Sequence, residues 1–355
     1  MNVLVDIGHP AHVHFFRHPL RLLRERGHRL LITSRDKEMA LTLLDDLGFA
    51  HQPISALGKG GLVGLGWELA RRNVALWHIV RRFQPDIMTA IGGTSIAQVG
   101  RMTGVPSLVF YDTENATLQN AMTYPFASCV AVPHCYRGWL PRRRHLRYRG
   151  FHELSYLHPK RFTPARALAL ANGLASQGDT FFVRLVSWQA SHDVGQCGWH
   201  VALLKQLLAE LRPLGKVLIS SEAPLPAAFE AYRYTGAAAA VHHVVAHCRA
   251  YIGESATMAS EAAMLGVPAL YCAQTARGYT DYLEAAFGLV RNVPKVNWAA
   301  LAPALRSVLE TDPGQWQQAR QAMLARHIDV AGFVSACVEN LHKQMQRYRQ
   351  SGAVF

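Results

Sequence analysis

The stretch Gly253–Pro268, GESATMASEAAMLGVP, carries the local signals of a helix that connects two strands of an α/β sheet. Ser255 or Thr257 can supply the hydroxyl that accepts a hydrogen bond from an N–H group in the first turn. Gly266 ends the helix, and Pro268 prevents its continuation. Short apolar runs on either side are expected to be strands, at Ala250–Ile252 and Ala269–Cys272.

The start of this helix is suited to an anion. Small side chains there leave the first N–H groups and the positive end of the helix dipole open. Glu261 follows within two turns, and a carboxylate at that distance suits the two hydroxyls of a ribose whose phosphates lie at the helix start. The alternative is an ordinary crossover helix with a surface glutamate, and the spacing alone does not decide between the two.

The rest of the chain repeats the alternation of strand and helix. Val3–Ile7 is a nearly continuous apolar run, which is typical of a parallel strand buried on both faces. The alternation predicts doubly wound parallel sheets with ligands at the carboxyl ends of the strands, and 355 residues suffice for two such domains. Further strands are expected at Leu30–Thr33, Asp86–Ala90, Ser107–Phe110, Thr180–Val186 and Lys216–Ser220, and helices at about Phe15–Arg26, Lys37–Leu47, Trp199–Leu211, Trp316–Arg326 and Val334–Arg349.

Composition excludes several classes of protein. Half of the residues are hydrophobic and 17% are charged, as in a globular protein. The six cysteines are scattered without a CxxC pair, so neither a zinc ribbon nor a disulfide framework is indicated. The N-terminal run contains Asp6 and reads as a strand instead of a signal peptide, and no apolar run is long enough to span a membrane. We therefore expect a cytoplasmic protein.

The Gly253–Pro268 stretch resembles the donor-nucleotide signature of glycosyltransferase-B enzymes, above all that of the peptidoglycan N-acetylglucosaminyltransferase that makes lipid II. The whole sequence also resembles a bacterial and archaeal family that carries only a domain-of-unknown-function label. The resemblance implies two Rossmann-like domains that face each other across a cleft. It implies an acceptor-binding domain at 1–160, a nucleotide-sugar-binding domain at 161–332, and a helix crossing back to the first domain at 333–355.

Four histidines follow the first expected strand. They are open to three interpretations: a metal site, packing or capping residues, or a catalytic histidine at a strand end. The run Ala11–His28, AHVHFFRHPLRLLRERGH, resembles the first loop and helix of glycosyltransferase-B enzymes, and His12 matches the histidine of their turn. The resemblance implies that His12 takes the proton from an acceptor hydroxyl, with His9 and His14 as the next candidates. The fourth histidine is His18, expected on the helix.

Two further motifs follow later strands of the first half. Pro85–Ser95, PDIMTAIGGTS, matches the PD…GG motif of the lipid II-forming enzyme, and its paired glycines permit close approach to a ligand. Tyr111–Ala116, YDTENA, resembles an acceptor-facing run of the same enzyme, although capping residues of a turn are the alternative. The residues singled out in these motifs are Gly92, Gly93, Thr94, Glu114, which we expect to assist His12, and Asn115.

The second half supplies the expected donor site. Arg184 can neutralise a diphosphate without a metal, although a structural ion pair is an equally good interpretation. His243 and His247 are four residues apart, but a helix surface is favoured over a metal site. The resemblance implies that Ser255, Ala256, Thr257, Met258 and Glu261 hold the donor, and Arg184 completes the expected donor set. Ser187, His192, Ser221 and Glu222 follow strands of this half and are expected to line the cleft.

Charge and exposed aromatic residues point to an anionic partner. The net charge is +13, and residues 1–165 hold 21 Lys and Arg against 11 Asp and Glu. The segment Gly58–Phe83 is either an amphipathic core helix or a patch for anionic lipid, with Trp67 and Trp77 beside Arg71, Arg72, Arg81 and Arg82. Arg137–Arg149 is expected to be a basic surface loop. Signature motifs of nucleic-acid-binding proteins do not occur in the sequence.

Together these features predict a metal-independent glycosyltransferase without a cofactor. Its donor is expected to be a nucleotide sugar, of UDP type by resemblance, and its acceptor a lipid-linked or other glycan. The resemblance alone implies a role in cell-envelope polysaccharide synthesis. The anionic inner-membrane surface is its expected peripheral partner. The alternatives are a nucleotide-sugar 2-epimerase and a nucleotide-sugar-binding protein without catalysis.

Overall fold

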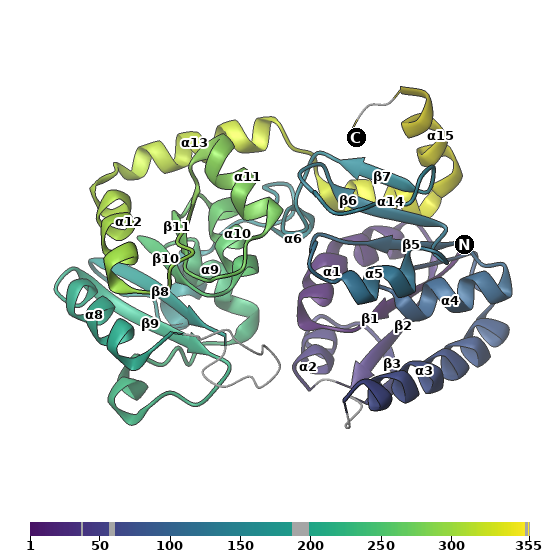
Figure 1. Cartoon of the computed structure of the whole chain (residues 1–355), viewed down its shortest axis with the longest axis horizontal. Coiled ribbons are helices and arrows are strands. Elements are labelled where there is room, and N and C mark those ends of the chain that lie inside the picture. The colour runs from purple at the N-terminus through teal and green to yellow at the C-terminus, as the bar shows by residue number, and fades with distance from the viewer. Residues whose placement is uncertain (37, 57–60, 187–198, 352–353, 355) are drawn as a thin grey trace. The chain divides into compact units, whose positions relative to one another are not determined.

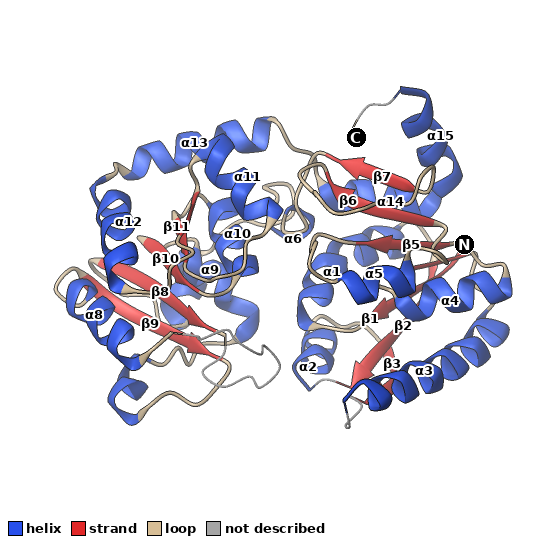
Figure 2. Cartoon of the chain, in the orientation of Figure 1, coloured by secondary structure: helices blue, strands red, loops and turns tan. Residues whose placement is uncertain are grey.

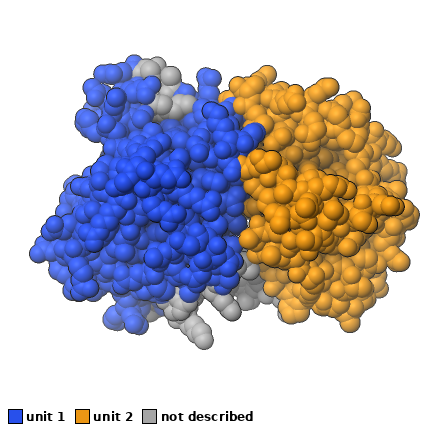
Figure 3. Space-filling view, turned by 180° about the vertical axis from the view of Figure 1, so that it is seen from behind, with its two compact units in different colours: residues 1–161, 327–355 blue, residues 162–326 orange. Residues whose placement is uncertain are grey.

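The computed structural model describes residues 1–36, 38–56, 61–186, 199–351 and 354. The chain divides into two compact units (Figure 3, blue and orange). Unit 1 comprises Met1–Arg161 together with His327–Phe355, and unit 2 comprises Phe162–Arg326. Each unit contains one wholly parallel sheet with helices between its strands (Figure 2).

The sheet of unit 1 has seven strands in the order β3-β2-β1-β4-β5-β6-β7. The order reverses between β1 and β4, which is the switch point where α/β proteins bind ligands at the carboxyl ends of their strands. Its central strands are apolar and buried on both faces, as predicted. The strands are β1 (Asn2–Ile7), β2 (Arg29–Asp36), β3 (His51–Ala56), β4 (Ile87–Ile91), β5 (Ser107–Phe110), β6 (Cys129–Pro133) and β7 (His145–Tyr148).

The helices of unit 1 form two groups (Figure 1). In one group α3 (Gly61–Phe83), α4 (Thr94–Thr103) and α5 (Thr117–Thr123) pack in succession. In the other, α1 (Pro10–Glu25) packs against α2 (Glu38–Asp46), α6 (Leu154–Leu157) and α14 (Val330–Glu339). Since β-α-β crossovers are right-handed, reversal of the strand order puts the two groups on opposite faces of the sheet.

The segment after Arg326 belongs to unit 1. Helix α14 packs on α1, and Glu339 at its end contacts Arg26 at 2.7 Å and His28 at 3.0 Å. Helix α15 (Leu341–Ser351) then packs against β7. The single helix expected over Val334–Arg349 is wrong in one respect, because the helix breaks at Asn340, whose backbone is not helical (φ −151°, ψ 60°).

The sheet of unit 2 has five strands in the order β12-β11-β10-β8-β9. The strands are β8 (Asp179–Leu185), β9 (Gly215–Ser221), β10 (Ala250–Gly253), β11 (Ala269–Tyr271) and β12 (Val290–Asn292). The helices are α7 (Arg166–Ala171), α8 (Val201–Leu211), α9 (Val241–Val245), α10 (Ala256–Leu265), α11 (Gly278–Phe287), α12 (Trp298–Glu310) and α13 (Pro313–Ala325), with 3₁₀ turns at Ala227–Tyr232 and Ala238–Ala240.

The basic stretch Arg137–Arg149 is only in part the surface loop that the sequence predicts: residues 137–144 form a loop, in which Arg142 and Arg143 are exposed. Its second half forms β7, in which Leu146 and Tyr148 are buried while His145 and Arg147 are half-buried. This alternation lets charged residues occupy one face of an edge strand. The alternation of buried and half-buried residues was not recognised in the sequence, because the stretch is rich in arginine.

Candidate functional site

The turn between β10 and α10 forms as predicted. Ser255 caps the helix, because its Oγ accepts a hydrogen bond from the Met258 N–H at 3.3 Å. Gly266 ends the helix in the left-handed region. Gly253 is required by close packing, since a Cβ there would overlap the backbone of Arg184 on the neighbouring strand β8.

Only the start of α10 is accessible. Thr257 and Met258 are half-buried, whereas every residue from Ala259 to Leu265 is buried. The first N–H groups of a helix have no partner within the helix, and Ser255 satisfies one of them. The first turn of α10 therefore presents backbone donors at the carboxyl edge of the sheet, which is the arrangement that binds phosphate in other α/β proteins.

Glu261 is not the surface residue considered in the sequence interpretation. Its side chain is 8% exposed, and Oε1 lies 3.0 Å from Nε2 of His242, a residue of α9 that is 1% exposed. The carboxylate and the imidazole therefore lie in close contact in the interior of unit 2. Any contact of Glu261 with a ribose would have to use the carboxylate oxygen that does not face His242.

Arg184 takes part in the structural contacts that were the alternative to a diphosphate site. Its guanidinium donates to Ser220 Oγ at 2.7 Å and to Glu222 Oε1 at 2.6 Å. Two predicted site residues, Arg184 and Glu222, are thus brought together, while Ser221 donates its hydroxyl to the carbonyl of Ala223. The predicted residues Ser187 and His192 lie outside the described part of the chain.

Glu254 is a residue of this edge that the sequence interpretation missed. Its carboxylate accepts the N–H of Val186 at 3.0 Å and the N–H of Trp199 at 3.1 Å. It therefore fixes both flanks of the segment 187–198, next to the turn that carries Ser255. The signal was available, because an acid directly after a buried strand lies at the ligand-binding edge of a parallel sheet.

In unit 1 the predicted loop histidines lie in α1 or cap it. His9 is the N-cap and accepts the N–H of Ala11 at 3.2 Å, so one of its roles is that of a capping residue. His12 lies in the first turn, and its Nδ1 accepts the N–H of Gly8 at 3.2 Å. The His14 ring packs against the Tyr156 ring in a tilted arrangement, with 5.5 Å between the centroids. Helix α1 begins earlier than predicted because Pro10 fits its first position.

The hydrogen bond from Gly8 constrains the chemistry of His12. A neutral imidazole that accepts at Nδ1 carries its proton on Nε2. In this arrangement Nε2 is a donor, so a role as general base requires the long bond from Gly8 to break. A role as hydrogen-bond donor to an anionic group requires no such change.

Asp112 and His152 form a pair that the sequence interpretation did not include. Asp112 Oδ2 lies 3.1 Å from His152 Nδ1, and Thr113 donates its hydroxyl to Oδ1 at 2.9 Å. Burial by itself would raise the pKa of the Asp112 carboxyl, but the charge of His152, the two hydrogen bonds and the charge of His12 together lower it to about 2. Asp112 is therefore an anion that interacts with both histidines.

The remaining predicted residues of unit 1 lie at the ends of β4 and β5. The Tyr111 hydroxyl donates to the carbonyl of Gly92, which joins the two strand ends. Thr94 opens α4 and its hydroxyl lies 2.8 Å from that of Thr123. Glu114 accepts the backbone N–H of Arg137 at 3.3 Å. Asn115 is exposed in the turn that follows Asp112, and Gly93 is the left-handed N-cap residue of α4.

These observations define two sets of polar residues, one in each unit. In unit 1, β1, β4 and β5 are adjacent, so the turns after them share the carboxyl edge of the sheet. In unit 2 the carboxyl ends of β8, β9 and β10 share the corresponding edge. Within the described residues no group of three or more metal-ligating side chains is found, and no helix has the length and apolarity needed to cross a membrane.

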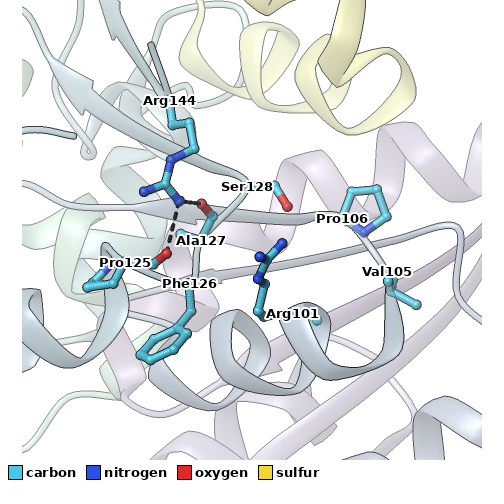
Figure 4. A pocket seen from close by; sticks show the side chains of 10 residues that line it. Arg101, Val105, Pro106, Pro125, Phe126, Ala127, Ser128 and Arg144 are labelled. Atoms are coloured by element: carbon cyan, nitrogen blue, oxygen red, sulfur yellow. Dashed lines mark hydrogen bonds between the residues drawn. The ribbon is translucent and has the colours of Figure 1, made fainter. Parts of the chain in front are cut away.

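A separate hollow lies at the opposite edge of the unit 1 sheet (Figure 4). It has a volume of about 510 Å³ and is lined by Pro106 and Ser128, which come just before β5 and β6. Arg144 is held there by hydrogen bonds to the carbonyls of Pro125 and Ala127 at 3.1 and 2.7 Å. This hollow is thus distinct from the predicted acceptor residues.

Solved structures of sugar-modifying enzymes share the fold. A UDP-GlcNAc 2-epimerase from Neisseria meningitidis, bound to UDP-GlcNAc, is 12% identical with a TM-score of 0.64 over 98% of this chain and 100% of its own. A putative UDP-N-acetylglucosamine 2-epimerase from Listeria monocytogenes is 11% identical with a TM-score of 0.69 over 97% of each chain. The spinosyn forosaminyltransferase is 15% identical with a TM-score of 0.62 over 98% of this chain and 99% of its own. The predicted glycosyltransferase-B fold class is confirmed.

Comparison of the sequence identifies the family of the chain. An uncharacterised protein of Methanocaldococcus jannaschii is 24% identical over 136 residues, which are 38% of this chain and 39% of that protein. The sequence pattern of the family described as "Protein of unknown function (DUF354)" matches residues 1–284. The chain therefore belongs to the DUF354 family and has a glycosyltransferase-B fold.

Proposed function

We propose that this protein is a glycosyltransferase that uses a nucleotide sugar as donor. The observation that carries the proposal is the first turn of α10, which combines a serine cap, open backbone donors and small side chains at the carboxyl edge of a parallel sheet. That turn suits the diphosphate of a nucleotide sugar. The fold is shared with a sugar transferase and with an epimerase bound to UDP-GlcNAc, which supports a UDP-type donor.

On the donor side, the leaving diphosphate gains negative charge as the glycosidic bond breaks. The N–H groups of Ala256 and Thr257 would stabilise that charge, and Met258 would cover the turn. Arg184 would contribute its guanidinium after exchanging Glu222 for the diphosphate, since an exposed carboxylate is a replaceable partner. Glu261 would hold the ribose while keeping His242 as its second partner.

On the acceptor side, the hydroxyl must lose its proton as its oxygen attacks the sugar. We assign that proton to His12, which would accept it at Nε2 after its ring rearranges to carry hydrogen on Nδ1. The anionic Asp112 would stabilise the resulting imidazolium, because its charge already interacts with that of His12. Glu114, Gly92, Gly93, Thr94 and Asn115 would line the acceptor site.

A lipid-linked glycan of the cell envelope is the acceptor we favour, because one face of α3 suits a membrane surface. Trp67, Val74 and Trp77 are 69%, 57% and 38% exposed, and the Arg81 guanidinium lies 5.6 Å from the Trp77 ring centroid. The expectation that Arg72 belongs to this patch is wrong: Arg72 is buried and contacts Asp6 at 2.6 Å. The α3 patch is therefore defined as Trp67, Arg71, Val74, Trp77 and Arg81.

Epimerisation at C2 of a nucleotide sugar is the second candidate, because the fold is shared with two 2-epimerases. Incubation with UDP-GlcNAc separates the two candidates. A 2-epimerase converts it to its C2 epimer without an acceptor, whereas a transferase leaves the sugar unchanged until an acceptor is supplied.

A ligand-stabilisation screen tests the shared premise that a nucleotide binds. At a hundredfold excess over Kd, a nucleotide stabilises the folded protein by about 2.7 kcal/mol. We expect UDP to raise the melting temperature more than CMP, GDP or dTDP, and we expect the shift to persist in EDTA. If none of the four nucleotides raised the melting temperature, both candidate functions would be contradicted.

A further inference from the structure

A groove of about 500 Å³ lies between α3 and strands β2 and β3, away from the predicted acceptor residues. It runs beside Arg29 at the start of β2 and Phe83 at the end of α3, so it opens at the amino ends of these strands. Its volume is within the range of small-molecule sites in proteins.

The floor of the groove is the uncovered margin of a hydrophobic core. Leu31, Ile54 and Ile79 pack against the cluster of buried residues between α3 and the sheet, but each remains only partly buried. Since β3 is the edge strand, no further strand among the described residues covers this margin. Apolar surface of this kind is stabilised by an apolar ligand.

The rim of the groove is cationic. Arg29, His78 and Arg82 line it, and no Asp or Glu is among its lining residues. The guanidinium of Arg29 lies 5.2 Å from the centroid of the ring of Phe83, which also lines the groove. Neither the Arg29 nor the Arg82 guanidinium forms a hydrogen bond or ion pair with another described residue, so both can receive an anion.

We propose that this groove binds one anionic lipid molecule, with an acyl chain against Leu31, Ile54 and Ile79 and the headgroup between Arg29 and Arg82. The combination fits an amphiphile better than a free phosphate, which would leave the apolar floor uncovered. The site extends the membrane contact proposed for the α3 patch, because His78 adjoins Trp77 with ring centroids 5.0 Å apart. It does not depend on the transfer reaction.

The test uses single-chain lipids below their micelle concentration, so that no membrane surface is present. Lysophosphatidylglycerol is expected to bind the full chain at least tenfold more tightly than lysophosphatidylcholine in isothermal titration calorimetry, since charge-assisted bonds to the headgroup are lost with the latter. The double variant Arg29→Gln/Arg82→Gln should remove this preference. Gln52→Trp places a large ring in the groove from an exposed strand position and should abolish binding of both lipids.

Two control variants distinguish binding in the groove from binding at other basic sites of unit 1. Arg101→Gln changes an exposed arginine at the other hollow and should leave lipid binding unchanged. Arg71→Gln/Arg81→Gln weakens the α3 patch, so it should reduce binding to anionic vesicles but not to monomeric lysophosphatidylglycerol. Equal affinity for the two lipids, or unchanged binding by Gln52→Trp, would overturn the proposal. Self-association of the free protein that Gln52→Trp abolishes would assign the groove to a second copy instead.

Discussion

Glu261→Ala should destabilise unit 2 strongly, because it leaves a buried imidazole without its acidic partner. His242 is 1% exposed and its Nε2 lies 3.0 Å from the Glu261 carboxylate, which is itself 8% exposed. Removing one partner of a buried ion pair costs about 3–5 kcal/mol. A domain of this size loses about 2–4 °C in melting temperature per kcal/mol, so we expect a decrease of roughly 6–12 °C at the lower bound.

Differential scanning calorimetry and urea unfolding at neutral pH measure this effect. Glu261→Gln is the matched variant, because it keeps the size and polarity of the side chain while the charge is lost. We expect it to lose less than half as much stability as Glu261→Ala. A Glu261→Ala protein that unfolds within 1 kcal/mol of the wild type would refute the structural role of the pair.

The same two variants also test the ribose contact. If Glu261 binds the ribose, Glu261→Gln should weaken UDP binding by about tenfold, in line with the loss of a charge-assisted hydrogen bond. If the residue is only structural, Glu261→Gln should bind UDP as the wild type does. The free energy of unfolding thus reports on the contact of Glu261 with His242, and the affinity for UDP reports on its contact with the ribose.

Three further predictions concern unit 1. The pKa of Asp112 in the folded protein is about 2, below its ordinary value. Its interactions should therefore add about 2 kcal/mol to the free energy of unfolding above pH 4, and this contribution should be lost as the pH falls from 4 towards 2. Asp112→Asn should therefore lower the free energy of unfolding at pH 7, with a difference from wild type that narrows below pH 4 in urea titrations; a pH-independent difference would argue against a charge effect. Gly93→Ala should lose more than about 2 kcal/mol, because φ is +44° and a Cβ would lie 2.8 Å from Val109 Cγ1, whereas Gly104→Ala, at φ +76° with open space, should lose only about 1 kcal/mol in the same assay. His12→Gln should cut turnover about a hundredfold or more while UDP affinity in calorimetry stays within twofold, and normal turnover would assign the proton to another group.

Local signals made the α10 turn predictable. Ser255, Gly266 and Pro268 act within a few residues of their own positions, so capping rules apply to them without knowledge of the fold. The strands β1 and β5 were predictable for the same reason, since each is a run of consecutive, mostly apolar residues that are buried. The alternation of these elements was sufficient to predict the fold class.

The polar pairs were not predictable, because each joins distant parts of the chain. Asp112 and His152 are 40 residues apart, and each adjoins a turn in which it reads as an ordinary polar residue. Arg72 directly follows the exposed Arg71 in the sequence, and only the helical phase of α3 directs it inward to Asp6. Such contacts depend on strand order, which local patterns do not fix.

The return of the chain to unit 1 has a consequence for biosynthesis. Unit 2 is one continuous segment, Phe162–Arg326, whereas unit 1 needs α14 to cover α1 and Glu339 to reach Arg26 and His28. Domains generally fold as units while the chain emerges from the ribosome. Unit 2 is therefore expected to acquire its native packing first, although it is translated second. Until α14 has been synthesised, the apolar surface of α1 that it covers stays exposed. We expect the nascent chain to be most prone to aggregation, and most dependent on chaperones, during this interval.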